Sequence, residues 1–231
     1  MERWINSQHK QRFTRVLCAT LAILLASIIP AYAEKGIANV YHCRENEEMK
    51  IALTFDDGPH PILTPKILDI LGKYQIKATF FIVGENAKNY PDVVERILSE
   101  GHEIGNHTFT HDKINSGEIE ACEKAIYELT DYKTKLFRPP QGYISQSVKD
   151  ASADLGYDII LWNIDTRDWA HTPAHQICEN VIDNITTGSI ILMHDYISYH
   201  SPTPEALEQM IPQIIELGYQ FVLVSELIGT K

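Results

Sequence analysis

Two adjacent carboxylates, Asp56 and Asp57, stand at the end of a short apolar segment and are the first residues that could do chemistry. The segment Ile51–Phe55 is apolar and partly β-branched, which predicts a buried strand, and Gly58-Pro59 then starts a loop. Neighbouring acids at the end of a buried strand repel each other and are costly to desolvate. A cation beside them would relieve that repulsion, whereas the alternative is a solvated Asp-Gly turn.

Two histidines offer ligands for such a cation. His107 and His111 are four residues apart, so on a helical turn both rings would point the same way. Two imidazoles and one carboxylate complete a three-ligand zinc site that leaves one position open for water. The His-x-x-x-His spacing alone is weak support, because surface helices produce it by chance. The strand end at Asp56-Asp57 strengthens it.

Strand-like and helix-like segments alternate along the body of the chain. About seven repeats predict a parallel sheet with helices outside, either a barrel or an open doubly wound sheet. No glycine-rich phosphate loop follows the first strand, which argues against nucleotide binding. The expected strands are 51–55, 78–83, 103–105, 136–137, 158–164, 189–193 and 220–224, and the expected helices are 65–74, 92–99, 118–132, 146–155, 173–185 and 204–217.

Unusual polar residues collect where the expected strands end. In parallel α/β folds the active site forms at the carboxyl ends of the strands. Solvated loops alone would not favour His, Asp and Arg so consistently. The clusters are Asp56-Asp57, Asn106 to His111, Arg138 to Gly142, Asp165 to Trp169, and His194-Asp195.

The first 33 residues have the pattern of a signal peptide. A basic opening precedes an uncharged, mostly apolar run from Val16 to Ile29, which is short for a membrane span. An Ala31-Tyr32-Ala33 pattern follows, so we expect cleavage after Ala33 and an exported protein, secreted or in the cell envelope. The alternative is an uncleaved N-terminal anchor. If the signal is cleaved, we expect no stable membrane partner.

Charge and size limit the partners and the number of domains. The formal net charge is −11, and cleavage would remove four basic residues and one acidic residue, leaving about −14. Such an acidic protein is not expected to bind nucleic acid. The rest suits one domain, which we place at residues 50–229 after a polar lead-in over residues 34–49. It keeps Cys43, Cys122 and Cys178, which allow at most one intramolecular disulfide.

The strand-end clusters match five sequence motifs in order. They are TFDDG (54–58), HTFTH (107–111), RPPQG (138–142), DTRDW (165–169) and ILMHD (191–195). On these motifs the chain resembles the polysaccharide deacetylases, the NodB-homology domain of carbohydrate esterase family 4, from about Lys50 to Ile228. The resemblance implies a distorted (β/α) barrel of about seven parallel strands. It also implies metal-dependent removal of N-acetyl groups from amino sugars.

The resemblance further implies roles for individual residues. Asp57, His107 and His111 would bind a divalent metal ion, in our interpretation Zn²⁺, because an amide is a poor electrophile that needs a Lewis acid. Asp56 would be the general base that takes a proton from the attacking water, and Arg138 would orient it. The alternatives are a loop-capping carboxylate at Asp57 and an ordinary surface ion pair at Arg138.

The leaving amine needs a proton, and by the same resemblance His194 is the candidate general acid, with a reference pKa near neutrality. Asp168 would hold the other ring nitrogen of His194 and stabilise the imidazolium; the alternative is a structural histidine. The backbone N–H of Gln141, where many family members have tyrosine, is a candidate oxyanion donor. Trp169 and Leu192 would line a pocket for the acetyl methyl group, or simply pack in the core.

The expected substrate is a polysaccharide that contains N-acetylglucosamine. We favour peptidoglycan and leave chitin oligomers and poly-N-acetylglucosamine open. An acetyl-xylan esterase is the alternative enzyme, because the same residues cleave O-acetyl esters. The alternative outside enzymology is an inactive barrel that binds glycan. We expect the protein to be a monomer.

Overall fold

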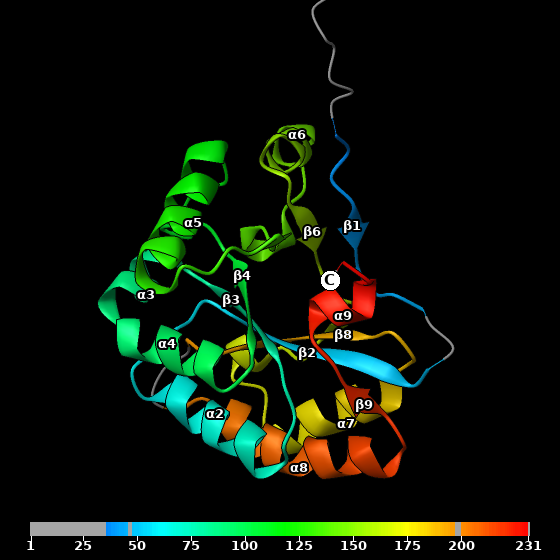
Figure 1. Cartoon of the computed structure of the whole chain (residues 1–231). Helices are drawn as coiled ribbons and strands as arrows, with labels where there is room; N and C mark the ends of the chain where they lie inside the picture. Colours follow the sequence, from blue (N-terminus) through cyan, green and yellow to red (C-terminus); the bar gives the residue numbers. More distant parts are fainter. Residues whose placement is uncertain (1–35, 46–47, 197–199, 231) are drawn as a thin grey trace, which may run out of the picture. The chain divides into compact units, whose positions relative to one another are not determined.

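The computed structural model describes residues 36–45, 48–196 and 200–230. The expected signal segment and its cleavage site lie outside these residues. Within the described ranges, no helix has both the length and the apolar character needed to cross a membrane. Helices flank a curled sheet of parallel strands (Figure 1).

The strands that form the sheet are short. They are β1 (Val40–Tyr41), β2 (Lys50–Asp56), β3 (Thr79–Ile82), β4 (Glu103–Asn106), β5 (Leu136–Phe137), β6 (Asp158–Ile160), β7 (Ile164–Asp165), β8 (Ile190–His194) and β9 (Gln220–Phe221). Their order is β1-β6-β5-β4-β3-β2-β8-β7, with β9 pairing with β2, and the strand pairs are parallel. The expected α/β class and distorted barrel are confirmed.

The helices pack on the outside of the sheet. They are α2 (Leu63–Lys73), α3 (Gly84–Asn89), α4 (Pro91–Ser99), α5 (Ser116–Thr130), α6 (Gln146–Leu155), α7 (Ala174–Asn184), α8 (Thr203–Glu216) and α9 (Val224–Ile228), with 3-10 turns η1 (Pro140–Gly142) and η2 (Asp168–Ala170). Helix α8 packs against both α2 and α7 (Figure 1). In α2, Ile67, Leu68 and Leu71 are buried while Lys66 and Asp69 are exposed, as expected for a helix with one face on the core.

Strand β2 lies in the interior of the sheet, because it pairs with β3 on one side and with β8 on the other. Ile51, Leu53 and Phe55 are completely buried. A strand covered on both faces is a near-continuous apolar run, which is what the sequence has there. The parallel register places Asp56 opposite His194, so the functional ends of β2 and β8 meet at one edge of the sheet.

The single strand expected over residues 158–164 was wrong, because the structure has two strands there. Strand β6 lies near one end of the sheet order and β7 lies at the other end, with only residues 161–163 between them. Such a connection spans at most about 14 Å. The two ends of the sheet therefore lie close together, which explains how a sheet with free edges approaches a barrel.

Two further differences from the sequence expectation lie near the ends of the domain. The sheet begins earlier than Lys50, because β1 in the polar lead-in pairs with β6. The strand expected over 220–224 ends at Phe221, and Val224 begins α9. The N–H of Val224 donates to the Thr79 hydroxyl (3.0 Å), so a side chain takes the place of a strand partner. The three described cysteines are free thiols.

We expect Leu53→Ala to lower the free energy of unfolding by about 2 to 5 kcal/mol, because it leaves a cavity in a closely packed, fully buried strand. Urea denaturation measures this change. The matched control is Ile215→Ala on the exposed side of α8, which we expect to change the same quantity by less than about 0.5 kcal/mol. A Leu53→Ala effect as small as that of the control would contradict the interior position of β2.

Candidate active site

A pocket of about 380 Å³ opens at the carboxyl ends of the strands. Parallel α/β folds place their active sites at this edge. The side chains that line it are Asp56, Asp57, His107, His111, Gln141, Trp162, Asp165, Trp169, Leu192 and His194. The pocket therefore brings together residues from each of the strand-end clusters found in the sequence.

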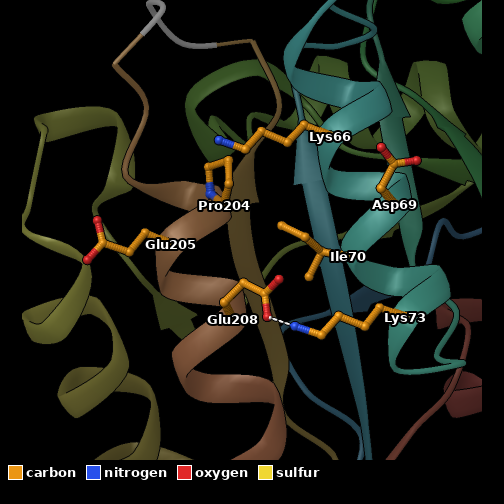
Figure 2. A pocket seen from close by; sticks show the side chains of 7 residues that line it. All are labelled: Lys66, Asp69, Ile70, Lys73, Pro204, Glu205 and Glu208. Atoms are coloured by element: carbon orange, nitrogen blue, oxygen red, sulfur yellow. Dashed lines mark hydrogen bonds and ion pairs between the residues drawn. The ribbon is translucent and has the colours of Figure 1, made fainter.

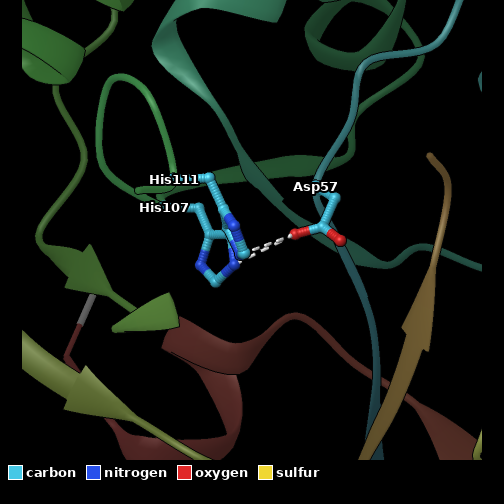
Figure 3. Close-up of side chains that lie close together, drawn as sticks. All are labelled: Asp57, His107 and His111. Carbon is cyan, nitrogen blue, oxygen red and sulfur yellow. Dashed lines mark ion pairs between the residues drawn. The ribbon is translucent and has the colours of Figure 1, made fainter. Parts of the chain in front are cut away.

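Asp57, His107 and His111 have the spacing of metal ligands (Figure 3). Oδ1 of Asp57 lies 3.2 Å from Nε2 of His107 and 3.2 Å from Nε2 of His111. Two ligand atoms bound at about 2.0–2.2 Å to a tetrahedral ion stand about 3.3–3.6 Å apart. The three side chains thus fit a divalent metal ion, and all three also line the pocket.

The two histidines do not lie on a helix, so the helical turn expected from their spacing was wrong. They lie in a loop after β4, where Thr108 and His111 both have a left-handed φ of 67°. The Asn106 side chain accepts a hydrogen bond from the N–H of Thr108 (2.9 Å), whose hydroxyl accepts one from the N–H of His111 (3.1 Å). These local bonds replace a helical ladder and bring the two rings to a centroid separation of 5.0 Å.

The backbone carbonyl of Arg138 fixes the orientation of His107. Nδ1 of His107 lies 2.7 Å from this oxygen, which can only accept a hydrogen bond. The Nδ1 atom therefore carries a proton, and in the neutral ring Nε2 presents its lone pair to the side of Asp57. Metal-binding histidines are commonly held in this way, so the contact supports the assignment of His107 as a ligand.

The charges of the cluster suit a cation. Burial alone would raise the pKa of Asp57, but the hydrogen bond and charge of His107 outweigh it and lower that pKa to about 2. Burial would lower the pKa of His107, but the charges of Asp56 and Asp57 raise it. Because a metal binds the neutral imidazole, protons compete with it at His107, and metal affinity should fall as the pH is lowered.

Asp56 and Arg138 form a buried pair beside the metal ligands. Nη1 of Arg138 donates to Oδ1 of Asp56 at 2.6 Å, and Arg138 has no exposed surface. This bond occupies Oδ1, while Oδ2 lies 3.9 Å from Nε2 of His107. One oxygen of Asp56 is thus fixed by the guanidinium, and the other is left on the side of the ligand cluster, where a base would act.

His194 and Asp168 form a second pair, in which the buried carboxylate holds the histidine at two points. Oδ1 of Asp168 lies 2.8 Å from Nδ1 of His194, and Oδ2 accepts from its backbone N–H at 2.8 Å and from the Thr203 hydroxyl at 2.7 Å. Burial would lower the pKa of His194, but the hydrogen bond and charge of Asp168 raise it to about 9. The ring therefore carries a proton at neutral pH.

Gln141, Trp169 and Leu192 complete the wall of the pocket. Gln141 has a left-handed φ of 58° within η1, which turns the chain sharply at the pocket. Trp169 is 51% exposed, so it does not pack in the core, whereas Leu192 is only 3% exposed. Together with the half-buried Trp162, these two residues give the pocket an apolar part that runs from a buried leucine to an exposed aromatic ring.

Comparison with known proteins identifies the family. The sequence model described as polysaccharide deacetylase matches residues 44–160. The chain belongs to the polysaccharide deacetylase family. The resemblance to this family is thereby confirmed, and the matched residues include the first three of the five motifs.

Individual relatives of this polysaccharide deacetylase support the same assignment. A peptidoglycan-N-acetylglucosamine deacetylase of Bacillus cereus is 41% identical over 194 residues, covering 80% of this chain and 91% of the relative. A chitooligosaccharide deacetylase of Sinorhizobium fredii is 33% identical over 187 residues, covering 73% and 87%. The crystal structure of a peptidoglycan N-acetylglucosamine deacetylase aligns with a TM-score of 0.79 at 37% identity, covering 83% of this chain and 92% of that one.

Sequence reasoning did not single out Trp162 or Thr54, although both support the site of this family member. Trp162 lines the pocket, and a Cβ atom at Gly142 would come within 2.8 Å of its ring. The Thr54 hydroxyl accepts from Nη1 of Arg138 at 2.8 Å and donates to the Ile191 carbonyl at 2.7 Å. The sequence signal for Thr54 was a hydroxyl in an otherwise apolar strand. Trp162 lies in an apolar segment, and nothing in its sequence context indicated a place in the site.

Another pocket lies between α2 and α8 and shares no lining residue with the deacetylase pocket (Figure 2). Its lining residues are Lys66, Asp69, Ile70, Lys73, Pro204, Glu205 and Glu208. Nζ of Lys73 lies 2.5 Å from Oε2 of Glu208 across it. It has exposed charges of both signs and neither histidine nor cysteine, so we assign no chemistry to it.

With His194 as the general acid expected from the sequence, its raised pKa predicts an alkaline limb in the pH profile of kcat/KM. An acid must be protonated to act, so activity is present below the pKa and is lost as the pH rises through it. A bound cation offsets the charges of Asp56 and Asp57, so we expect this limb below about 9 in the metal-loaded enzyme. Asp168→Asn removes the main cause of the raised pKa and should move the limb to lower pH, with turnover reduced about 10²–10⁴-fold.

A control variant and a zinc titration test this pH prediction further. Thr203→Val keeps the Asp168 carboxylate and removes only one hydroxyl, so its alkaline limb should move less than that of Asp168→Asn. Zinc titration should give Asp168→Asn an affinity within about threefold of the wild type, because Asp168 contacts no proposed ligand. An unchanged limb, or loss of the metal, would contradict the role of Asp168.

Proposed function

We propose that this chain is a zinc-dependent deacetylase that removes N-acetyl groups from N-acetylglucosamine residues of peptidoglycan. The observation that carries the proposal is the arrangement of the pocket. Three candidate metal ligands line the same pocket as a carboxylate held by an arginine and a histidine held by a carboxylate. Hydrolysis of an amide needs both a base for the water and an acid for the amine, and the pocket has one candidate for each.

A metal ion at Asp57, His107 and His111 would acidify a bound water and polarise the acetyl carbonyl. Asp56 is placed to take a proton from the attacking water, because Arg138 holds one of its oxygens and leaves the other near the ligands. The backbone N–H of Gln141 is the proposed hydrogen-bond donor to the developing oxyanion.

Collapse of the tetrahedral intermediate requires that the nitrogen leave as an amine. His194 carries the proton for this step at neutral pH, and Asp168 stabilises the imidazolium before the transfer. Leu192 and Trp169 enclose the space proposed for the acetyl methyl group. The apolar lining would hold the small acyl group, while the amino sugar lies toward the open side of the pocket.

Peptidoglycan is the proposed substrate because the relative with 41% identity is named for it, at nearly full coverage of that protein. Chitin oligomers are the second amino-sugar candidate, supported by the chitooligosaccharide deacetylase at 33% identity. An O-acetyl ester on xylan is a third candidate, because an acetyl xylan esterase of Clostridium thermocellum with a known structure is 34% identical to this chain. The higher identities of the peptidoglycan deacetylases, 41% in sequence and 37% in structure, favour the amide over the ester. Zinc is proposed because two imidazoles and one carboxylate are a common catalytic zinc set.

The test is acetate release from N-acetylglucosamine oligomers, peptidoglycan and acetylated xylan, before and after chelation and return of zinc. We expect acetate from the amino-sugar substrates, its loss on chelation, and its recovery with zinc. Asp56→Asn should lower turnover about 10²–10⁴-fold, because the base is removed while the shape of the side chain is kept.

Each other result of this assay has a definite meaning. Release from xylan alone would replace the proposal by an ester hydrolase. Unchanged turnover in Asp56→Asn would remove Asp56 as the base. Glycan binding without acetate release in both wild type and variant would favour the inactive glycan-binding barrel.

We also propose that the protein is exported and that the first 33 residues are removed. The support is the basic, apolar and Ala-x-Ala pattern of this segment. N-terminal sequencing of the protein recovered outside producing cells should then begin at Glu34. A chain that still begins near Met1 would contradict cleavage and favour the membrane anchor.

A further inference from the structure

A buried carboxylate that the proposed mechanism does not use lies against the turn that carries the proposed metal ligand Asp57. Asp195 has no exposed surface, and it follows His194 at the end of β8. Its Oδ2 accepts a hydrogen bond from the Thr64 hydroxyl at 2.6 Å. Its Oδ1 has no hydrogen-bond partner among the residues that the structure describes. A charged group in such a place is costly to desolvate, so a role for it has to be sought in what it touches.

Asp195 contacts the turn that carries Asp57 at two points. Its backbone N–H donates to the carbonyl of Asp56 at 3.1 Å, on the residue before the ligand. Its carboxylate packs on Gly58, on the residue after the ligand: a Cβ atom there would stand 2.1 Å from Oδ2 and 2.3 Å from Oδ1. Only glycine lets the carboxylate approach this closely. Asp195 therefore contacts the residue before Asp57 and the residue after it.

The turn needs such support because Asp57 has a left-handed φ of 75°, which is uncommon for a residue with a side chain. The Asn86 side chain donates to the Asp57 carbonyl at 2.7 Å, and the Val83 N–H donates to the Gly58 carbonyl at 2.8 Å. These two bonds hold the turn from the side of β3 and α3. Asp195 is the contact from the side of β8.

Thr64 fixes the carboxylate that makes this contact. It lies in the first turn of α2, is fully buried, and accepts a hydrogen bond from the His60 N–H at 2.8 Å while donating to Asp195. The His60 N–H, the Thr64 hydroxyl and the Asp195 carboxylate thus form a chain of hydrogen bonds from the loop after β2 to the end of β8. The carboxylate at its end packs on Gly58 of the same loop. Because a hydroxyl has a single proton, donation to Asp195 also sets which lone pair faces His60.

We propose that Asp195 is a positioning residue for the metal ligand Asp57. Together with Thr64 it holds the Asp56–Gly58 turn so that the Asp57 carboxylate points at His107 and His111, and it thereby sets the affinity of the site for zinc. The inference rests on the metal site of the proposed function. It concerns the binding of the ion and requires no turnover.

The fold supplies a matched control for this proposal. Thr203, in the first turn of α8, donates to the buried carboxylate of Asp168 at 2.7 Å, just as Thr64 in the first turn of α2 donates to Asp195. The first pair supports His194, and the second supports the turn of Asp57. Removing either hydroxyl by Thr→Val keeps the shape and the carboxylate, so the two variants differ mainly in which side of the pocket loses its support.

The experiment is a zinc titration of the full chain, freed of metal by chelation, against a chromophoric competitor at constant pH. We expect Thr64→Val and Asp195→Asn to bind zinc about 10–100-fold more weakly than the wild type, the usual cost of losing a partner that orients a ligand. Thr203→Val should bind within about threefold of the wild type. Thr64→Ser keeps the hydroxyl and should restore most of the affinity.

The melting temperature of each zinc-free variant separates positioning from general stability. A merely structural role would lower this temperature in Thr64→Val without changing the dissociation constant for zinc, and that result would overturn the proposal. Equal weakening in Thr203→Val would also overturn it, because the effect would not be specific to the Asp57 turn. If Asp195→Asn does not fold, a Thr64→Val variant that binds zinc as tightly as the wild type would overturn the proposal.

Failure of the proposed function gives a different pattern. A wild type that binds zinc but releases no acetate from any substrate overturns the deacetylase proposal and leaves the role of Asp195 standing. A wild type that releases zinc-dependent acetate, with Thr64→Val and Asp195→Asn binding zinc as tightly, leaves the function standing and overturns the role of Asp195.

Discussion

The rest of the site depends on one buried cation, the guanidinium of Arg138. It has no contact with water, so its N–H groups must find partners inside the protein. Nη1 donates to Asp56 and Thr54, while Nε and Nη2 donate to the carbonyls of Ile160 and Leu161. Those carbonyls lie where β6 ends and the chain crosses to β7. One side chain thus orients the candidate base and satisfies the backbone at the break in the barrel.

The same residue also links the candidate base to the candidate metal site. Its side chain holds Asp56, and its own carbonyl orients His107, so displacement of this segment would disturb two functions at once. The ring of Phe81 lies 4.0 Å from the guanidinium carbon. A flat aromatic face against the cation stabilises it in a place that water does not reach. Arg138 is therefore not exchangeable for lysine, whose ammonium lacks the flat fork that reaches four acceptors.

The positions of the site residues were predictable from the sequence, and their local geometry was not. The alternation of segments places Asp56, His107 and His194 at or just after the ends of three buried strands. Parallel strands carry such residues to one edge whatever the details of the loops. The loop of His107 was misjudged because the side chains of Asn106 and Thr108 impose left-handed turns that spacing alone does not reveal. The break after Ile160 was missed because a partner distant in the sequence, Arg138, stabilises it.

The pairing of β2 with β8 has a consequence for how the protein acquires its activity. Thr54 and Ile191 are joined by a hydrogen bond although 137 residues separate them. Strand β2 therefore cannot complete its ladder until nearly the whole chain is available, and contacts of such high contact order form slowly. A nascent chain would have Asp57, His107 and His111 but neither His194 nor the far wall of the pocket. Assembly of the catalytic pocket is thus one of the last steps in the folding of the newly made polypeptide.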